Sequence, residues 1–193
     1  MSSFLGHALI GISIGSDERN SSFMKRTISL SFFAFLAISP DIDYLGIWLI
    51  GYEIEPRYTH SIGFCLLVSF LSVFIYKIII SRNLCIPVVM SIILAPLSHL
   101  ALDYFVGVHE SPFLWPIYSE KFCSSIGILP SAGRIDLQNI YFWRNLLIEM
   151  AILLPVAACI KNRGIPKEIP LIVNALLFGF FCVGIVFGLN LSR

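Results

Sequence analysis

Long apolar runs separated by short polar stretches dominate the chain. Four runs are about 20 residues long, the length that a helix needs to cross a ~30 Å hydrocarbon core. They are 61–80, 85–105, 142–160 and 169–189. Two shorter runs, 4–15 and 28–39, are about 12 residues long, too short to cross unaided, and are predicted to form a helical hairpin against the others. The pattern predicts an all-α, polytopic membrane helical bundle, with about four full transmembrane helices plus an N-terminal pair of shorter helices.

Composition supports an integral membrane protein and excludes other classes. Of the 193 residues, 57% are hydrophobic and 13% are charged, whereas ordinary soluble domains carry about 25% charged residues. A net charge of +1 provides no field that would attract nucleic acid, so nucleic acid is not expected as a partner. The five cysteines form no CxxC pair, so neither a disulfide framework nor a cysteine zinc site is expected. The length predicts a single domain over 1–193.

The distribution of basic residues predicts the orientation of the helices. Lysine and arginine concentrate in short cytoplasmic loops of membrane proteins. The connections 16–27, 77–84 and 161–168 hold eight of the thirteen basic residues and fall on one side of the membrane under strict alternation. The opposite ends, at 40–60 and 106–141, hold most of the acidic residues and two of the three tryptophans. The third, Trp143, lies at the start of the next predicted helix, at the same end. We therefore expect the polar chemistry to face the periplasm or the outside.

Ionisable residues that are distant in sequence fall at these outer helix ends. Two patterns stand out among them. His99 and Asp103 are four residues apart, so they share one face of a helix, and Asp41 and Asp43 are two apart, so both can face one cavity. With two isolated histidines added, the candidate metal ligands are His7, Asp41, Asp43, His60, His99 and Asp103.

Metal ligation is one interpretation of these residues, and ordinary structural roles are the alternative. An ionisable side chain in a membrane helix is costly and is usually functional, and paired carboxylates repel unless a cation lies between them. The alternatives are a hydrogen bond within the helix for His99 and Asp103, a turn after Pro40 for the two aspartates, and packed or solvated imidazoles for the remaining histidines. Zinc suits the imidazoles, while manganese or magnesium suits the carboxylates.

Several short motifs in register resemble a known family. They are Gly6-His7, Pro40-Asp41-Ile42-Asp43, Thr59-His60-Ser61, Ser98-His99-x3-Asp103 and Pro112-Phe113-Leu114-Trp115-Pro116. This set resembles the YdjM-like family of inner-membrane metal-dependent hydrolases over roughly residues 1–120. The resemblance implies a metal-dependent hydrolase that uses the six candidate ligands. The chain departs from the family where it has Glu55-Pro56-Arg57 in place of His-Arg-Gly, and Glu55 offers another oxygen ligand.

A weaker similarity points to zinc-dependent bacterial phospholipases C. It depends on the spacing His99-x3-Asp103-x5-His109, which makes His109 a further candidate ligand. Asn145 and Glu149 stand where that family has histidine and glutamate, so Glu149 is also a candidate. The alternative for Glu149 is a buried carboxylate paired with Arg144 or Arg134.

The function expected is phosphoester hydrolysis of a lipid or lipid-linked substrate at the outer face of a bacterial inner membrane. Two zinc ions about 3.5–4 Å apart would activate water, with Asp41 or Asp43 as general base. Thr59 and Ser61 would orient the histidine rings. Arg57 is the main candidate to bind phosphate, with helix capping or lipid headgroup contact as its alternative role. Lipid deacylation at the same site, metal-ion transport and a structural or partner-binding role remain alternatives.

Overall fold

The computed structural model describes residues 3–15, 22–44, 46, 51, 55–80, 84–107, 110–125, 127–131, 137–162 and 171–190. These residues form helices and no strand, apart from one isolated bridge between Ser111 and Phe122. The helices are α1 (Phe4–Ile14), α2 (Phe23–Ile38), the 3-10 turn η1 (Ser39–Ile42), α4 (Ile62–Ile79), α5 (Ile86–Val106), α6 (Ile140–Asn162) and α7 (Leu171–Leu189). The prediction of an all-α fold is confirmed.

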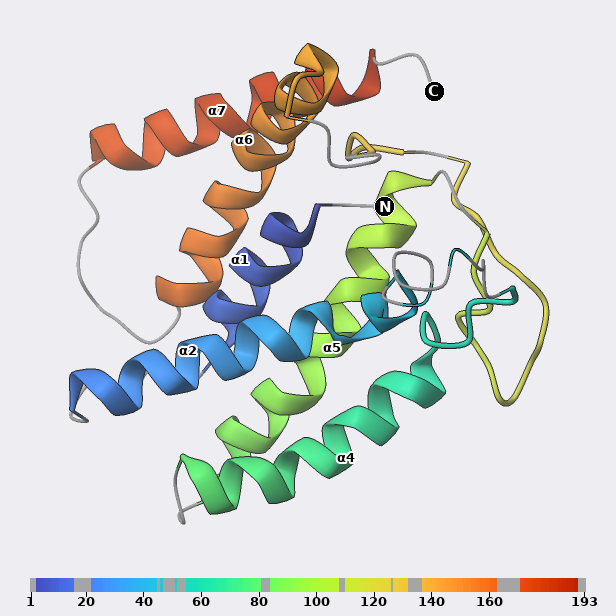
Figure 1. Ribbon diagram of the computed structural model, residues 1–193. Helices are drawn as coiled ribbons and strands as arrows, with labels where there is room; N and C mark the ends of the chain where they lie inside the picture. The colour runs from blue at the N-terminus through green and yellow to red at the C-terminus, as the bar shows by residue number, and fades with distance from the viewer. Residues whose placement is uncertain are drawn as a thin grey trace.

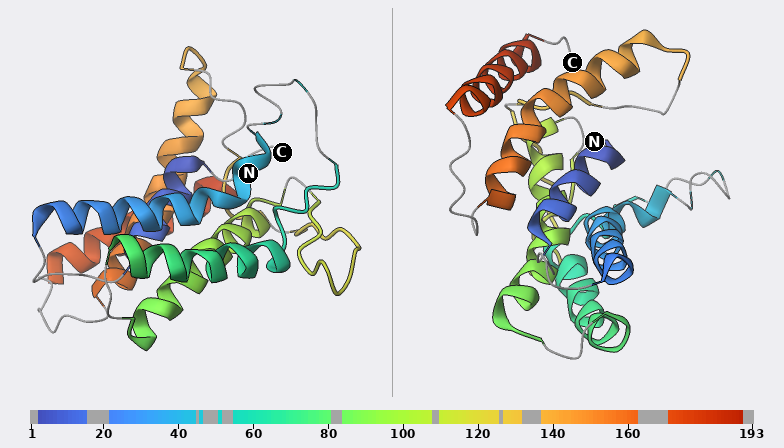
Figure 2. Two further views of the ribbon diagram at one scale, coloured as in Figure 1. Left: turned by 60° about the horizontal axis from the view of Figure 1, so that its bottom comes forward. Right: turned by 90° about the vertical axis from the view of Figure 1, so that its left-hand side faces the viewer.

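Helix α5 runs through the middle of the bundle (Figure 1). It packs against α1, α2 and α4, while α6 packs against α1 and α7. Phe33, Tyr76 and Ile92 are fully buried where α2, α4 and α5 meet, and Ile10 and Ile152 belong to a second apolar cluster between α1, α5 and α6. Two further views show α1 placed between the α2–α4–α5 group and the α6–α7 pair (Figure 2).

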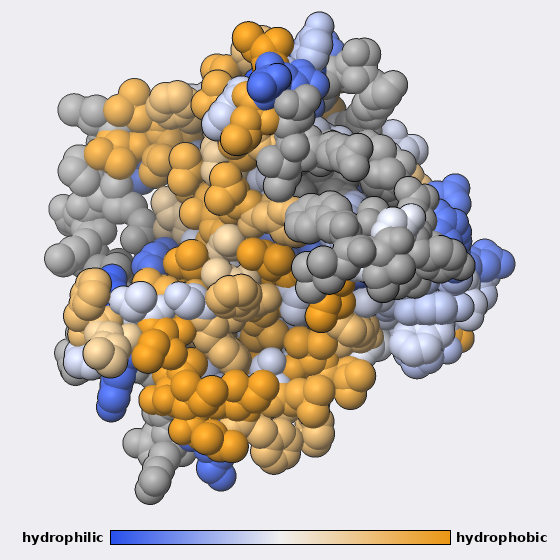
Figure 3. Space-filling view, viewed as in Figure 1, coloured by the Kyte–Doolittle hydropathy of each residue, from blue (hydrophilic) through white to orange (hydrophobic). Residues whose placement is uncertain are grey.

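Three described helices are long and apolar enough to cross a membrane, and the prediction of four is wrong in number. They cover Ile62–Ile79, Ile86–Val106 and Ile140–Lys161. The apolar stretch Val173–Leu189 of α7 is shorter. At 1.5 Å per residue it extends about 26 Å, less than the ~30 Å hydrocarbon core. Exposed apolar side chains cover much of the surface, as the orange atoms in Figure 3 show, which suits contact with lipid.

The predicted N-terminal hairpin is present as α1 and α2, which pack against each other. Helix α2 begins at Phe23, five positions before the predicted start at 28, because the basic residues Lys25 and Arg26 are good helix formers and continue the helix. Gly11 allows the close approach of the two helices. A Cβ atom at Gly11 would lie 2.5 Å from both the Cβ of Ala37 and the backbone oxygen of Phe33.

The first turn of α4 is fixed by a capping side chain and by the 111–117 segment. The Ser61 hydroxyl accepts from the Phe64 N–H, and the carbonyls of Phe113 and Trp115 accept from the N–H groups of Ile62 and Gly63, at 2.8 and 3.0 Å. These bonds satisfy donors that every helix start leaves open. Because His60 directly precedes this turn, the capping also fixes the backbone that carries its ring.

Helix α5 contains Pro96, one turn before His99. A proline lacks the N–H that would bond to the carbonyl four residues earlier, which here belongs to Ile92. The Ser69 hydroxyl of α4 lies 3.2 Å from that carbonyl oxygen. The proline is therefore accommodated at the α4–α5 contact, and the helix continues to Val106 with His99 and Asp103 on its inner face.

Candidate metal centre

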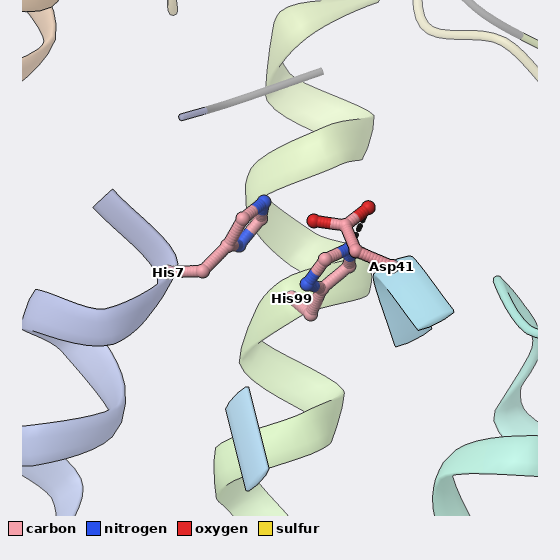
Figure 4. Close-up of side chains that lie close together, drawn as sticks. All are labelled: His7, Asp41 and His99. Carbon is pink, nitrogen blue, oxygen red and sulfur yellow. Dashed lines mark ion pairs between the residues drawn. The ribbon is translucent and has the colours of Figure 1, made fainter. Parts of the chain in front are cut away.

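Four segments far apart in the sequence bring six His and Asp side chains to one place. His7 comes from the first turn of α1. Asp41 lies in η1 and Asp43 directly follows it. His60 lies two residues before α4, and His99 and Asp103 lie in α5. Figure 4 shows His7, Asp41 and His99 pointing toward one another from three of these segments. All three histidines are 0% exposed, and Asp41 and Asp43 are 4% and 6% exposed. The predicted convergence of the six residues is confirmed as geometry.

The cluster is centred on His60 and His99. Their Nε2 atoms lie 3.3 Å apart. Asp41 Oδ1 lies 3.3 Å from the Nε2 of His60 and 3.5 Å from that of His99. Asp103 Oδ2 lies 3.5 and 3.6 Å from the same two nitrogens. Three overlapping groups have donor atoms within 4.8 Å of one another and could hold a metal ion: His7, Asp41 and His99; His60, His99 and Asp103; Asp41, Asp43 and His60.

Backbone and side-chain contacts orient the two central imidazoles. The Nδ1 of His99 lies 2.8 Å from the carbonyl oxygen of Ala37. Because a carbonyl can only accept, Nδ1 carries the proton and Nε2 presents its lone pair to the cluster. Thr59 Oγ1 lies 3.2 Å from the Nδ1 of His60, as predicted for this threonine. Ser61, predicted to act likewise, donates instead to the Tyr58 carbonyl and caps α4.

His7 is fully buried and stacks on another histidine of the cluster. Its ring stacks on that of His99 with centroids 3.7 Å apart and planes 12° apart. Neither ring nitrogen makes a hydrogen bond within the described part of the chain, and the same holds for Asp41 Oδ2. Asp103 Oδ1 lies 3.5 Å from the Nε2 of His7, within ion-pair distance. Buried polar atoms of this kind are costly unless something binds them.

Asp43 is held by Arg57. The guanidinium makes two contacts with this carboxylate, at 2.5 Å from Nε to Oδ2 and 3.0 Å from Nη2 to Oδ1. Nη2 also lies 3.0 Å from the Nε2 of His60 and 3.7 Å from Asp41 Oδ1. The guanidinium carbon lies 4.7 Å from the centre of the Tyr44 ring. Tyr44 was not predicted, and its place directly after Asp43 is the only sequence signal that could have found it.

Electrostatic interactions keep the Asp41 carboxylate and the Arg57 guanidinium ionised at this end of the bundle. Burial alone would raise the pKa of Asp41, but hydrogen bonds with His60 and His99 outweigh it and lower the pKa to about 2. Burial would lower the pKa of Arg57, yet its hydrogen bonds to Asp43 raise that pKa. Burial raises the pKa of Tyr44 to about 12, so its hydroxyl stays neutral.

Among the residues that the structure describes, the other candidates do not join the cluster. Glu55 is exposed and pairs with Lys121 at 3.4 Å. Glu149 is buried, as one alternative expected, and its Oε1 accepts from the Ser3 backbone N–H at 2.9 Å. Arg144 contacts the side chain of Asn145, next to it in α6. His109 and Arg134 lie outside the described residues.

The donor set suits a divalent metal. Imidazole nitrogens and carboxylate oxygens are the common ligands of zinc, and manganese also accepts them. The buried His7 nitrogens and Asp41 Oδ2, which otherwise carry an uncompensated cost, would gain a partner. The six side chains therefore fit a metal ion.

Comparison with known proteins gives one clear result. The sequence profile of the YdjM inner membrane protein family matches residues 1–190, well beyond the 1–120 over which the motifs suggested it. No curated protein and no solved structure matches the chain, and nothing shows the similarity to zinc-dependent phospholipases C. Three candidate spans and this match indicate a multi-pass inner-membrane protein. The chain belongs to the YdjM inner membrane protein family.

Proposed function

We propose that the protein is a metal-dependent hydrolase of the inner membrane that cleaves a phosphoester bond in a lipid or lipid-linked substrate at the outer face. The observation that carries the proposal is the convergence of three imidazoles and three carboxylates, all buried, in one place. Buried ionisable residues in a membrane protein are expensive and are kept for function.

The chemistry follows from the donor set and its neighbours. A bound divalent metal supplies a nucleophile by lowering the pKa of water toward ~7 and polarises a phosphoryl oxygen; zinc is preferred, with manganese or magnesium as alternatives. Asp43, which Arg57 holds beside the cluster, is the candidate general base, with Asp41 as the second candidate. Arg57 presents a planar fork that matches phosphate as well as it matches the Asp43 carboxylate.

A lipid substrate is favoured by the surroundings of the cluster. An apolar groove of about 420 Å³ lies at the same end of α5, between α4, α5 and the 113–122 segment, and its lining includes Leu100, Tyr104 and Phe113. The groove is on the face of α5 opposite His99 and Asp103. It offers a place for a hydrocarbon chain at the end of α5 that carries the cluster, across the helix from it, in keeping with the exposed apolar surface of α4 and α5.

Metal analysis of the purified full-length protein tests the first part of this proposal. Wild type is expected to retain zinc after dialysis, and His99→Ala to lose most of it. Glu55→Gln is the matched control, because Glu55 is exposed and paired with Lys121, and it is expected to retain metal as wild type does. Absence of metal from wild type, or equal metal in His99→Ala, would refute the proposed centre.

A substrate screen tests the second part. Metal-loaded protein is incubated with phospholipids and with polyprenyl phosphates, and products are identified by mass spectrometry. Release of phosphate or a phosphorylated headgroup supports the phosphoesterase. Release of a fatty acid alone would favour the deacylase, and no product from metal-loaded protein would count against a hydrolase.

A further inference from the structure

Four donor atoms in the cluster form two triangles that share the edge between the Nε2 atoms of His60 and His99, and each triangle has the spacing of zinc ligands. The four atoms are the Nε2 atoms of His60 and His99, Asp41 Oδ1 and Asp103 Oδ2. Five of the six distances among them are 3.3, 3.3, 3.5, 3.5 and 3.6 Å. A tetrahedron of ligands around zinc, with bonds of about 2.0–2.2 Å, has edges of about 3.3–3.6 Å. An octahedron around magnesium, with bonds of about 2.0–2.1 Å, has edges of only about 2.8–3.0 Å.

The atoms left over form a second group on the His7 side. Each of the two shared carboxylates has a second oxygen: Asp103 Oδ1 lies 3.5 Å from His7 Nε2, and Asp41 Oδ2 is buried without a hydrogen-bond partner in the described part of the chain. Both His7 ring nitrogens are likewise buried without a hydrogen bond to the described residues. These atoms offer three ligands, so an ion among them keeps a free coordination position, as catalytic zinc sites do.

Asp43 belongs to neither group, because both of its oxygens contact Arg57. Its Oδ2 also lies 3.6 Å from the Nδ1 of His60, on the side of the ring away from the cluster. The carboxylate therefore stands behind the imidazole, where it holds the ring and the guanidinium. An ion bound by the Nε2 of His60 would replace the Arg57 Nη2 contact at that nitrogen, while Arg57 keeps its two contacts with Asp43.

We propose that five of the six side chains form two unequal ion sites. The first is a closed site made by Asp41, His60, His99 and Asp103. The second is an open site made by His7 and the remaining oxygens of Asp41 and Asp103, and it receives water and substrate. Asp43 binds no metal. This inference rests on the proposed function only in requiring that metal binds.

The charges of this arrangement narrow the substrate class. Three carboxylates and one guanidinium have a net charge of −2. Two divalent ions add a charge of +4, so the loaded site has a net charge of +2. In a buried site of low dielectric constant, an excess charge is unfavourable unless it is paired. An anionic phosphoester offsets the excess and a neutral carboxylic ester does not, so the two-ion arrangement selects anionic substrates.

The experiment counts the zinc ions bound per chain. The full-length protein is loaded with zinc and dialysed, and its metal content is measured by elemental mass spectrometry. Wild type is expected to hold two ions per chain. His7→Gln is expected to hold one, and Asp43→Asn to hold two. A parallel set loaded with cobalt reports geometry, since four-coordinate cobalt absorbs visible light strongly. This absorption is expected to persist in His7→Gln and to be lost in His60→Gln. Arg144→Gln, an exposed arginine away from the cluster, is the control and should match wild type.

Each alternative result is decisive. One ion in wild type, or the loss of an ion in Asp43→Asn, would overturn the two-site inference and leave a metal-dependent hydrolase standing. Unchanged metal content in His7→Gln would overturn the open site. No metal in wild type would overturn the proposed function as well. Gel filtration in detergent shows whether each variant is folded, and if His7→Gln is not, the ion count of Asp43→Asn still tests the inference.

Discussion

His60 and His99 present the same ring nitrogen to the cluster for different reasons. His99 is oriented by the backbone carbonyl of Ala37 in α2, and a substitution of Ala37 would leave that carbonyl in place. His60 depends on the side chain of Thr59, its neighbour in sequence, and on Asp43 and Arg57. Groups that orient a ligand in this way strongly influence metal affinity. The His60 side of the cluster is therefore the more sensitive to substitution.

Thr59→Val tests this dependence. Valine keeps the shape of threonine but removes the hydroxyl near the Nδ1 of His60, so we expect zinc affinity to fall by about 10–100-fold. Competition with a chelator of known affinity measures the change. Thr27→Val is the matched control, because the Thr27 hydroxyl is exposed and donates to the Phe23 carbonyl within α2. Equal affinity in both variants would show that Thr59 does not orient the ring.

At the scale of elements, the position of α1 is set by its contacts with α2 and α6. Gly11 lets α1 approach the α2 backbone, and Gly6 faces the Glu149 carboxylate and Leu153 of α6. Helix α1 is short and has neither an acidic first turn nor a basic last turn, so its placement depends on packing. Because His7 lies on this helix, the packing of α1 also places the ring.

Gly11→Ala is expected to destabilise the protein by about 1–3 kcal/mol, the cost of inserting a methyl group where the Ala37 Cβ and a backbone oxygen leave no room. Thermal unfolding in detergent measures the effect. Gly179→Ala is the control, since a Cβ there meets nothing within 4 Å. It is expected to be neutral or slightly stabilising, because alanine favours helix. A similar decrease in both variants would argue against the close contact.

The element pattern could be predicted from hydropathy more fully than the contacts between elements. The helices α4, α5 and α6 begin and end within two residues of the apolar runs, because lipid-facing helices are apolar over nearly their whole length. The start of α2 was missed because Lys25 and Arg26 interrupt the apolar run without interrupting the helix. The Arg57–Asp43 pair was missed because a long side chain can reach partners on segments whose separation the sequence does not specify.

At the scale of the whole molecule, the site could be predicted because topology groups helix ends. Alternating helices place the start of α1, the end of α2, the start of α4 and the end of α5 on one side, and all six candidate ligands lie there. Which oxygens face which nitrogens depends on helix rotation and packing, which periodicity alone does not define. The orientation of that side toward the periplasm remains a prediction.

Two native cysteines at opposite ends of α5 test the orientation. Cys123 and Cys85 are both exposed, the first in the segment that follows the site end of α5 and the second directly before its start. In variants that keep one cysteine each, a membrane-impermeant maleimide added to intact spheroplasts is expected to label Cys123 and to spare Cys85. Disrupted membranes serve as the control, in which both should react. Labelling of Cys85 alone would reverse the proposed orientation.

The bond from the Ser3 N–H to Glu149 gives the C-terminal helices an indirect role. None of the six candidate ligands comes from α6 or α7, yet α6 holds the first turn of α1, which carries His7. Substitutions along α6 can therefore tune the ligand on the open side of the cluster while the four atoms of the closed side keep their geometry. Related chains that differ mainly in this half would share one ion site and diverge in the other, so that substrate preference can evolve without loss of the fold.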